Sequence, residues 1–340
     1  MNILSLQLLY KESTPQQVYE AFWVNNGVAT KLGDITDLSK TFASAYSSAC
    51  YVFDGDLYYN IERITTGRNI SCFTGLLTAA SVYSYFIEEG KLYWVNRANG
   101  QSTITQIGSD SDWLKLTGYS SGANCVIAEK SDGLYSISNM TVAQISTLTG
   151  WSKIVGSANT GSANYYGYGI KDGKLYYIYA NGDGVVQKGS DTTWSDISGY
   201  GNIFSAIYCG YGINNGKLYA LGTTIAQVGS DTNWSKISGV SYSPSNVSNR
   251  GCGFGIKADG KLYTLFETTA TQVGSSADWQ NCSGKASSSN KGLIYDSTSL
   301  YSIMFDRTTT KLLDGDFVYC DGDFGTNSTT GAYAIAIRRK

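Results

Sequence analysis

Two short phrases recur along this chain in phase with each other, and their spacing constrains the fold more than any other feature. The first is G-K-L-Y or a close variant, whose aromatic residue returns every 35 to 44 residues. Its clear copies end at Tyr58, Tyr93, Tyr135, Tyr176, Tyr219, Tyr263 and Tyr301. A weaker copy aligns Trp23 with the tyrosine position, 35 residues before Tyr58. The second phrase is Q-x6-W, as in Gln227 to Trp234, and it occurs five times.

The tryptophan of the second phrase has a counterpart in every unit. The five tryptophans are Trp113, Trp151, Trp194, Trp234 and Trp279, and the weaker units place Leu38, Ile70 and Phe317 at the same offset. Three residues after each anchor another mostly apolar residue follows, namely Phe73, Leu116, Ile154, Ile197, Ile237, Cys282 or Cys320, with Thr41 as the exception. This pattern predicts that both positions are buried.

A third run, rich in glycine and apolar residues, precedes each G-K-L-Y phrase, as in YGYGI (166–170) and CGFGI (252–256). Each unit therefore offers four short β-type runs, separated by turns such as K-D-G and G-S-D. Helical periodicity is missing over any useful length. Repeats of about 40 to 45 residues with four strands each are typical of a β-propeller.

Eight copies of each strand type can be counted, so we expect an all-β propeller of four-stranded antiparallel blades. Eight blades are favoured, with seven as the alternative if residues 1–45 form a separate arm. The run YAIAI (333–337) has no following partner, so we expect it to pair with the N-terminal strands and close the ring. Residues 1–14 are expected to be a strand-like arm, and residues 15–340 a single propeller domain. Because blades crowd toward the centre, we expect the glycine-rich strand to be innermost and the tryptophan strand to lie farther out.

The order of these strands, with D-G-K-L-Y after an inner strand that ends in an apolar pair, resembles the regulator-of-chromosome-condensation repeat. It is closest in style to the bacterial β-lactamase inhibitor protein II type of propeller. The resemblance covers roughly residues 45–337 and is strongest over 165–285. It implies a propeller that binds other macromolecules through one face. The family usually has seven blades, unlike the count here, and none of its functional residues maps onto this sequence.

The composition excludes several kinds of function. The chain has no histidine, which is the commonest general base and metal ligand in proteins. Its net charge is −2 and only 15% of its residues are charged, so no basic surface for nucleic acid is expected. Seven cysteines occur without a C-x-x-C pair, which favours small buried apolar side chains over metal ligands. We therefore expect no metal, no cofactor and no nucleic-acid partner.

Catalysis by acidic side chains is also not expected. Asp110, Asp191 and Asp231 lie on equivalent turns of different units, so they cannot form the close pair of carboxylates that glycoside hydrolysis needs. The phrase S-D-T-T-W (190–194) resembles the Asp-box of sialidases, but it lacks the glycine of that box. We interpret these acids as turn residues and expect that the protein is not an enzyme.

Long irregular segments on a rigid scaffold are where binding usually occurs. If strands alternate in direction, the K-D-G and G-S-D turns share one face of the disc, and the other face carries segments of variable length that are rich in aromatic residues. Our candidate binding residues on that face are Tyr165, Tyr166, Tyr200, Phe204, Tyr242 and Arg250. In the alternative interpretation these tyrosines only cover the edges of blades.

The leading functional hypothesis is a non-enzymatic structural or interaction protein of a virus particle, such as a bacteriophage capsid or tail appendage. Its partners would be copies of itself or other virion proteins, and a surface glycan, and its surface of Tyr, Ser, Asn and Gly suits adaptable binding. The alternatives are a soluble bacterial inhibitor or adaptor and, less favoured, a carbohydrate-active enzyme. The start of the chain lacks the features of a signal peptide, and no apolar run approaches the ~18 residues of a membrane span. We expect a location in a virion or outside the cell.

Overall fold

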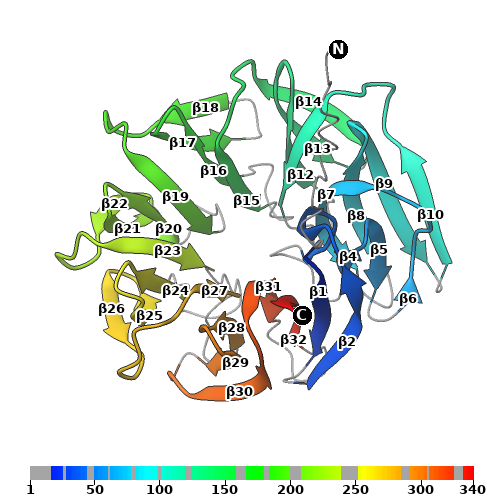
Figure 1. Ribbon diagram of the computed structural model, residues 1–340. Coiled ribbons are helices and arrows are strands. Elements are labelled where there is room, and N and C mark those ends of the chain that lie inside the picture. The colour runs from blue at the N-terminus through cyan, green and yellow to red at the C-terminus, as the bar shows by residue number, and fades with distance from the viewer. Residues whose placement is uncertain are drawn as a thin grey trace, which may run out of the picture.

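The computed structural model is a ring of eight four-stranded antiparallel sheets, which is an eight-bladed β-propeller (Figure 1). The structure describes residues 17–25, 28–43, 50–59, 62–77, 82–98, 101–118, 125–138, 140–157, 166–179, 184–199, 208–238, 252–284, 291–304, 306–324 and 332–340. The predicted all-β fold and the favoured number of blades are confirmed. The expected arm, residues 1–14, lies outside the described residues.

We number the blades from the one that closes the ring and give the strands of each blade from the centre outward. Blade 1 consists of β31 (Phe317–Phe324), β32 (Ala332–Arg339), β1 (Tyr19–Asn25) and β2 (Val28–Ile35). Blade 2 consists of β3 (Phe42–Ala43), β4 (Cys50–Phe53), β5 (Asp56–Tyr59) and β6 (Glu62–Arg63). Blade 3 consists of β7 (Ile70–Leu77), β8 (Val82–Glu88), β9 (Lys91–Ala98) and β10 (Gln101–Gln106). Blade 4 consists of β11 (Trp113–Thr117), β12 (Cys125–Lys130), β13 (Gly133–Ser138) and β14 (Thr141–Ser146).

The remaining blades follow the same order. Blade 5 consists of β15 (Lys153–Ser157), β16 (Tyr166–Lys171), β17 (Lys174–Tyr179) and β18 (Gly184–Gln187). Blade 6 consists of β19 (Trp194–Gly199), β20 (Tyr208–Asn214), β21 (Lys217–Gly222) and β22 (Ile225–Gln227). Blade 7 consists of β23 (Trp234–Ser238), β24 (Cys252–Lys257), β25 (Leu262–Phe266) and β26 (Thr269–Gln272). Blade 8 consists of β27 (Asn281–Ser283), β28 (Lys291–Tyr295), β29 (Ser299–Met304) and β30 (Thr309–Asp314), and one 3-10 helix (Leu38–Lys40) precedes β3.

Blade 1 joins the two ends of the described chain. Strand β1 pairs with β32 over seven residues, from Tyr19 opposite Arg339 to Asn25 opposite Tyr333. The C-terminal part of the chain supplies the two inner strands of this blade, and the N-terminal part supplies the two outer ones. This confirms the prediction that the ring closes by pairing of strands from both ends.

The radial order of the strands differs from our expectation. The strand that begins at the tryptophan position is innermost, not the glycine-rich strand, which comes second. Figure 1 shows β15, β19, β23 and β27 bordering the central opening, and the innermost strands of successive blades contact one another. Close approach of neighbouring blades at the centre, which we predicted, therefore does not explain these glycines.

These glycines make room for the tryptophan of their own blade. In blade 5 a Cβ atom on Gly169 would lie 2.6 Å from the indole of Trp151, and that ring meets Tyr176 of the third strand edge to face at a centroid distance of 5.1 Å. Each tryptophan thus lies across the second strand and contacts the tyrosine of the third. The other pairs are Trp113 with Tyr135 at 5.4 Å, Trp194 with Tyr219 at 5.3 Å, Trp234 with Tyr263 at 5.0 Å and Trp279 with Tyr301 at 5.2 Å.

Blades 2 and 3 lack the tryptophan and supply the aromatic ring from the second strand instead. Phe86 occupies the glycine position opposite Tyr93, and the two rings stack at 4.9 Å. Tyr51 stacks on Tyr58 in the same way at 5.4 Å. The prediction that Leu38 serves as the anchor of blade 2 is wrong, because Leu38 lies in the 3-10 helix and is 38% exposed. In these blades one aromatic ring contacts the tyrosine of the third strand, and either the innermost or the second strand supplies it.

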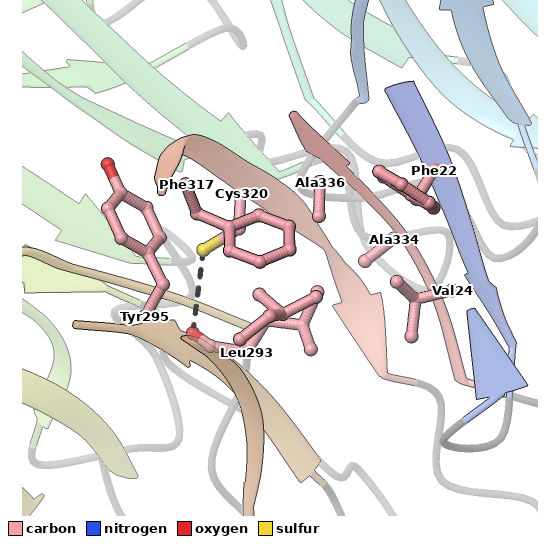
Figure 2. Close-up of a cluster of buried hydrophobic side chains, with 9 residues drawn as sticks. Phe22, Val24, Leu293, Tyr295, Phe317, Cys320, Ala334 and Ala336 are labelled. Carbon is pink, nitrogen blue, oxygen red and sulfur yellow. Dashed lines mark hydrogen bonds between the residues drawn. The ribbon is translucent and has the colours of Figure 1, made fainter. Parts of the chain in front are cut away.

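In blade 1 the residue at the tyrosine position of the third strand lies one residue before the one that we predicted. The register of β1 and β32 puts Phe22 opposite Ala336, which is the position that each tyrosine takes in the other blades. Phe22 and the anchor Phe317 are in ring contact at 6.4 Å, and Figure 2 shows Ala336 between them. Trp23, which the sequence placed there, points to the opposite side of the sheet and packs with Tyr51 of blade 2. Successive side chains of a strand point to opposite faces, so a shift of one residue exchanges their partners.

In the described part of the chain, five anchors bind the hairpin turn of the preceding blade through a backbone hydrogen bond, and the N–H of Trp151 donates instead to the Glu129 carboxylate of the preceding blade. The backbone N–H of Trp234 donates to the carbonyl of Gly216, in the hairpin turn of the preceding blade, at 2.8 Å. The same bond joins Ile70 to Gly55, Trp113 to Gly90, Trp194 to Gly173 and Trp279 to Gly260. The two repeated phrases of the sequence are therefore the two halves of one contact between blades.

The exchange between tryptophan and a second-strand aromatic residue can be tested in blade 7. We expect Gly255→Phe alone to destabilise the fold strongly, because even a Cβ there lies 2.7 Å from Trp234. Trp234→Ile alone should cost ~3 kcal/mol through the cavity that it leaves. The double variant should be at least ~1 kcal/mol more stable than the sum of the two losses, measured by urea denaturation. Strictly additive losses would contradict the exchange.

The contact between blades predicts that replacing two glycines, both with positive φ, lowers the free energy of unfolding by different amounts. A Cβ at Gly216 (φ +73°) would lie 2.1 Å from the carbonyl oxygen of Thr232, whereas at Gly229 (φ +64°) it would meet nothing within 4 Å. Gly229→Ala should cost only the ~1–2 kcal/mol of a left-handed backbone. Gly216→Ala should cost ~1–3 kcal/mol more, because the backbone of the next blade must move. Equal losses in urea unfolding would show that the close approach is unimportant.

Candidate binding face

The two faces of the disc are built differently. One face carries the hairpin turns between second and third strands and the connections from each outermost strand to the next innermost strand. These two kinds of segment touch, since Asn215 of a hairpin turn donates from its backbone N–H to the carbonyl of Thr193, directly before Trp194, at 3.1 Å. We call this the repeat face, because nearly the same residues recur on it in most blades.

Most connections on the repeat face have the same length, and the exceptions are 273–280 with eight residues and 315–316 with two. Six of the eight span six residues each, namely 36–41, 64–69, 107–112, 147–152, 188–193 and 228–233. The recurring glutamine holds the turn at their start, as in Gln187, whose Nε2 donates to the carbonyl of Gly189 at 2.8 Å. Gln106, Gln227 and Gln272 make the same bond. The glutamine of the repeated phrase is thus a structural residue.

The recurring aspartates of the repeat face bind within their own blades. Asp231 accepts from Nζ of Lys257 at 2.7 Å, and this ammonium also lies over the ring of Tyr263, 4.1 Å from its centroid. Asp110 pairs with Lys130 at 3.1 Å, and Asp191 accepts from the side-chain amide of Asn214 at 2.9 Å. This agrees with their interpretation as turn residues.

Asp56 of blade 2 is a buried acid of this face, with its side chain 4% exposed. It accepts from Nε of Arg63 at 3.1 Å, from the Thr65 hydroxyl at 2.9 Å and from the backbone N–H groups of Gly67 at 3.2 Å and Arg68 at 2.9 Å. Burial on its own would raise the pKa of this carboxyl, but the hydrogen bonds to its charged form outweigh burial and the pKa is lowered.

This carboxylate predicts a pH-dependent contribution to stability. Because the native pKa of Asp56 is below the ~3.9 of an unfolded chain, its charge stabilises the fold above about pH 4 and the contribution is lost as the pH falls through the native value. The difference in unfolding free energy between the native chain and Asp56→Asn should be large at pH 7 and should shrink toward pH 3. A difference that is the same at both pH values would contradict this.

The opposite face receives the segments that connect each innermost strand to the second strand, and we call it the variable face. Their lengths range from four residues (78–81) to thirteen (239–251). The others are 44–49, 118–124, 158–165, 200–207, 284–290 and 325–331. Because each starts at the end of an innermost strand, all eight leave the scaffold beside the central opening.

The predicted binding residues belong to these connections or border them. Tyr165, Tyr200, Phe204, Tyr242 and Arg250 lie outside the described residues. Tyr166 is the first residue of β16, and its side chain is outside the description as well. The assignment of these six residues to a binding site therefore stays a prediction.

Sequence reasoning missed a row of polar side chains on the innermost strands, two residues after each tryptophan. Lys153 of β15 forms an ion pair with Asp196 of β19, which ties the centres of blades 5 and 6 together. Lys115 pairs with Glu129 at 2.8 Å, and this buried carboxylate also accepts from the backbone N–H of Trp151 at 3.1 Å. Lys236 is the exposed member of the row in blade 7. The signal was the repeated charge at this offset, which we overlooked because we expected the tryptophan strands to lie outside.

The described thiols are not suited to chemistry. Cys50, Cys282 and Cys320 are buried, and Cys72 is partly buried. Burial raises the pKa of Cys72 to about 11 and that of Cys282 to about 12, so the reactive thiolate is scarce at neutral pH. Over the ranges that the structure describes, no three potential metal-binding side chains cluster, and no helix is long and apolar enough to cross a membrane.

Comparison with known proteins assigns neither a family nor a function. No protein-family model and no curated protein matches the chain. Among solved structures, PorZ of Porphyromonas gingivalis, a surface component of the type-IX secretion system, is similar over 80% of this chain at 12% identity and a TM-score of 0.49. The aligned part is 37% of the PorZ chain, so this chain spans much less than the length of PorZ.

Two further structures align over nearly their whole length. BamB of Moraxella catarrhalis is 13% identical, with a TM-score of 0.47 and coverage of 88% of this chain and 90% of BamB. Virginiamycin B lyase of Staphylococcus aureus is 8% identical, with a TM-score of 0.46 and coverage of 94% and 99%. BamB and the lyase are β-propeller proteins, and the narrower resemblance to regulator-of-chromosome-condensation repeats is not confirmed by any of these matches. Similarity at this level says nothing about what the chain binds.

Proposed function

We propose that the protein is a non-enzymatic interaction protein that binds a protein or glycan partner through its variable face, as a component of a virus particle. The observation that carries the proposal is the contrast between the faces. Six connections of equal length lie on the repeat face, whereas the segments between the innermost and second strands, which start from the other face, have four to thirteen residues. A scaffold that varies mainly on one face is the usual arrangement for recognition by loops.

The composition supports the same conclusion. The segments of the variable face carry Tyr, Ser, Asn and Gly and few charges, as in YGNIFSAI (200–207) and GVSYSPSNVSNRG (239–251). Tyrosine supplies a large amphipathic contact area with few torsions to fix, and Ser, Gly and Asn supply adaptable hydrogen bonds. Recurring acids and glutamines of the repeat face, such as Asp231, Asp191 and Gln187, are already bonded to residues of the scaffold.

The proposal is tested by binding of the purified protein to a glycan array and to intact bacterial cells. Tyr200→Ala/Tyr242→Ala should weaken binding at least tenfold, since a single aromatic anchor is worth ~2 kcal/mol or more. Ser190→Ala, on the exposed repeat face, is the matched control and should bind like the native chain. Unchanged binding by the double variant would remove these residues from the site.

The place of the protein in a virus particle needs a separate readout. Mass spectrometry of purified particles of the virus that encodes the chain should find it at a fixed copy number per particle. Its absence from such particles, together with a stable complex with one bacterial protein, would replace the virion proposal by the soluble adaptor.

A further inference from the structure

The outermost strands of the eight blades fall into two classes. Three of them, β2, β6 and β30, contain charged residues, as in the ion pair of Lys31 with Asp34 at 2.8 Å. The other five, β10, β14, β18, β22 and β26, contain no Asp, Glu, Lys or Arg. Charge is therefore missing from five successive edges of the ring, those of blades 3 to 7.

Charge on an edge strand has a known physical role. The outer side of such a strand has unpaired N–H and C=O groups that can accept another strand, and a charged side chain opposes that pairing because it would lose its hydration. None of the five uncharged strands has a partner on its outer side among the described residues. These edges are open to strand addition in a way that β2, β6 and β30 are not.

Strand β14 is the best candidate among the five. It has six residues, of which Thr141, Ala143 and Gln144 are exposed. Met140, directly before it, is 43% exposed, and Val186 of the neighbouring β18 is 41% exposed. Strands β14 and β18 contact each other at the rim, so the uncharged surface continues across two blades.

The chain itself contains a segment that suits this edge. Residues 3–9, ILSLQLL, lie outside the described residues, carry no charge and consist mainly of leucine and isoleucine. An uncharged apolar run of this length can add to a sheet edge by main-chain hydrogen bonds. The segment joins the described chain at blade 1, whose edge strand β2 and the flanking β6 and β30 are the charged ones.

The topology favours pairing between two copies over pairing within one. Strand β14 runs from the variable face to the repeat face, so an antiparallel fifth strand would end at the variable face. The described chain begins at Gln17, just before β1, which starts at the repeat face of blade 1 on the other side of the opening (Figure 1). The eight residues from 9 to 17 span at most ~29 Å. They would have to cover the ~20 Å length of the strand as well as the crossing from one blade to the other.

We propose that residues 3–9 of one copy add as a fifth strand to β14 of a second copy. The contact is head to tail, so it builds rings or longer assemblies according to the rotation between copies. This inference goes beyond the proposed function and does not depend on it, because it uses the rim of the disc and not the variable face.

Complementation between two defective chains tests the proposal. A chain that lacks residues 1–14 keeps β14 but has no arm, and Ala143→Lys keeps the arm but places a charge on the edge. Each should be monomeric by light scattering at concentrations where the native chain assembles, and their mixture should give a 1:1 dimer and nothing larger. The matched control is Thr310→Lys, since Thr310 of the charged strand β30 has the same register position as Ala143, and it should assemble like the native chain.

Three results would overturn the proposal. They are a native chain that stays monomeric at all concentrations, an Ala143→Lys chain that assembles normally, and a mixture that gives no heterodimer. Thermal unfolding of each variant shows whether it is folded, and the heterodimer itself requires that both are. Tyr200→Ala/Tyr242→Ala should assemble like the native chain, so a failure of the variable-face proposal and a failure of this one are told apart.

Discussion

The structure depends on one aromatic contact, made in each of the eight blades, that joins the third strand to the second or the innermost strand. In five blades a tryptophan from the innermost strand lies over the second strand and meets the tyrosine of the third, at 5.0 to 5.4 Å. In blades 5 to 7 the second strand has a glycine at the crossing, as Gly169 beneath Trp151, whereas blade 4 has Ala128 and blade 8 has Ile294 there. Where the tryptophan is missing, Phe86 or Tyr51 fills the same space. An aromatic ring therefore fills the same space in each blade, although the strand that supplies it differs.

The same anchor residues hold neighbouring blades together and so divide the molecule into two faces. At five anchors the N–H binds the glycine carbonyl of the preceding hairpin, and six of the eight connections on this face have the same length. The segments that start at the other ends of the innermost strands differ in length and composition. The connections of constant length are thus those beside the anchor bonds, and the connections that vary in length start at the other ends of the innermost strands.

The sequence predicted the positions of some residues correctly and those of others wrongly. The register of Tyr58 through Tyr301 and the burial of Ile197 and Cys320 were predictable, because a repeat fixes which positions are equivalent. Phe22 was not, since a shift of one residue in a strand exchanges its two faces and Trp23 is the larger aromatic residue. The prediction for Leu38 was wrong for another reason, because Tyr51 supplies the aromatic ring of that blade. The predicted residues of the variable face rest on the sequence alone.

The sequence by itself determined an all-β ring of eight four-stranded blades, closed by strands from both ends, because pairing within and between units follows from a local and repeated pattern. Only the tertiary structure decided which strand is innermost, since both radial orders of a blade satisfy the same strand pairing and differ only in the contacts between blades. That choice places Lys115, Lys153, Asp196 and Lys236 at the centre of the ring. It also leaves the uncharged glutamine-bearing strands, including β14, at the rim.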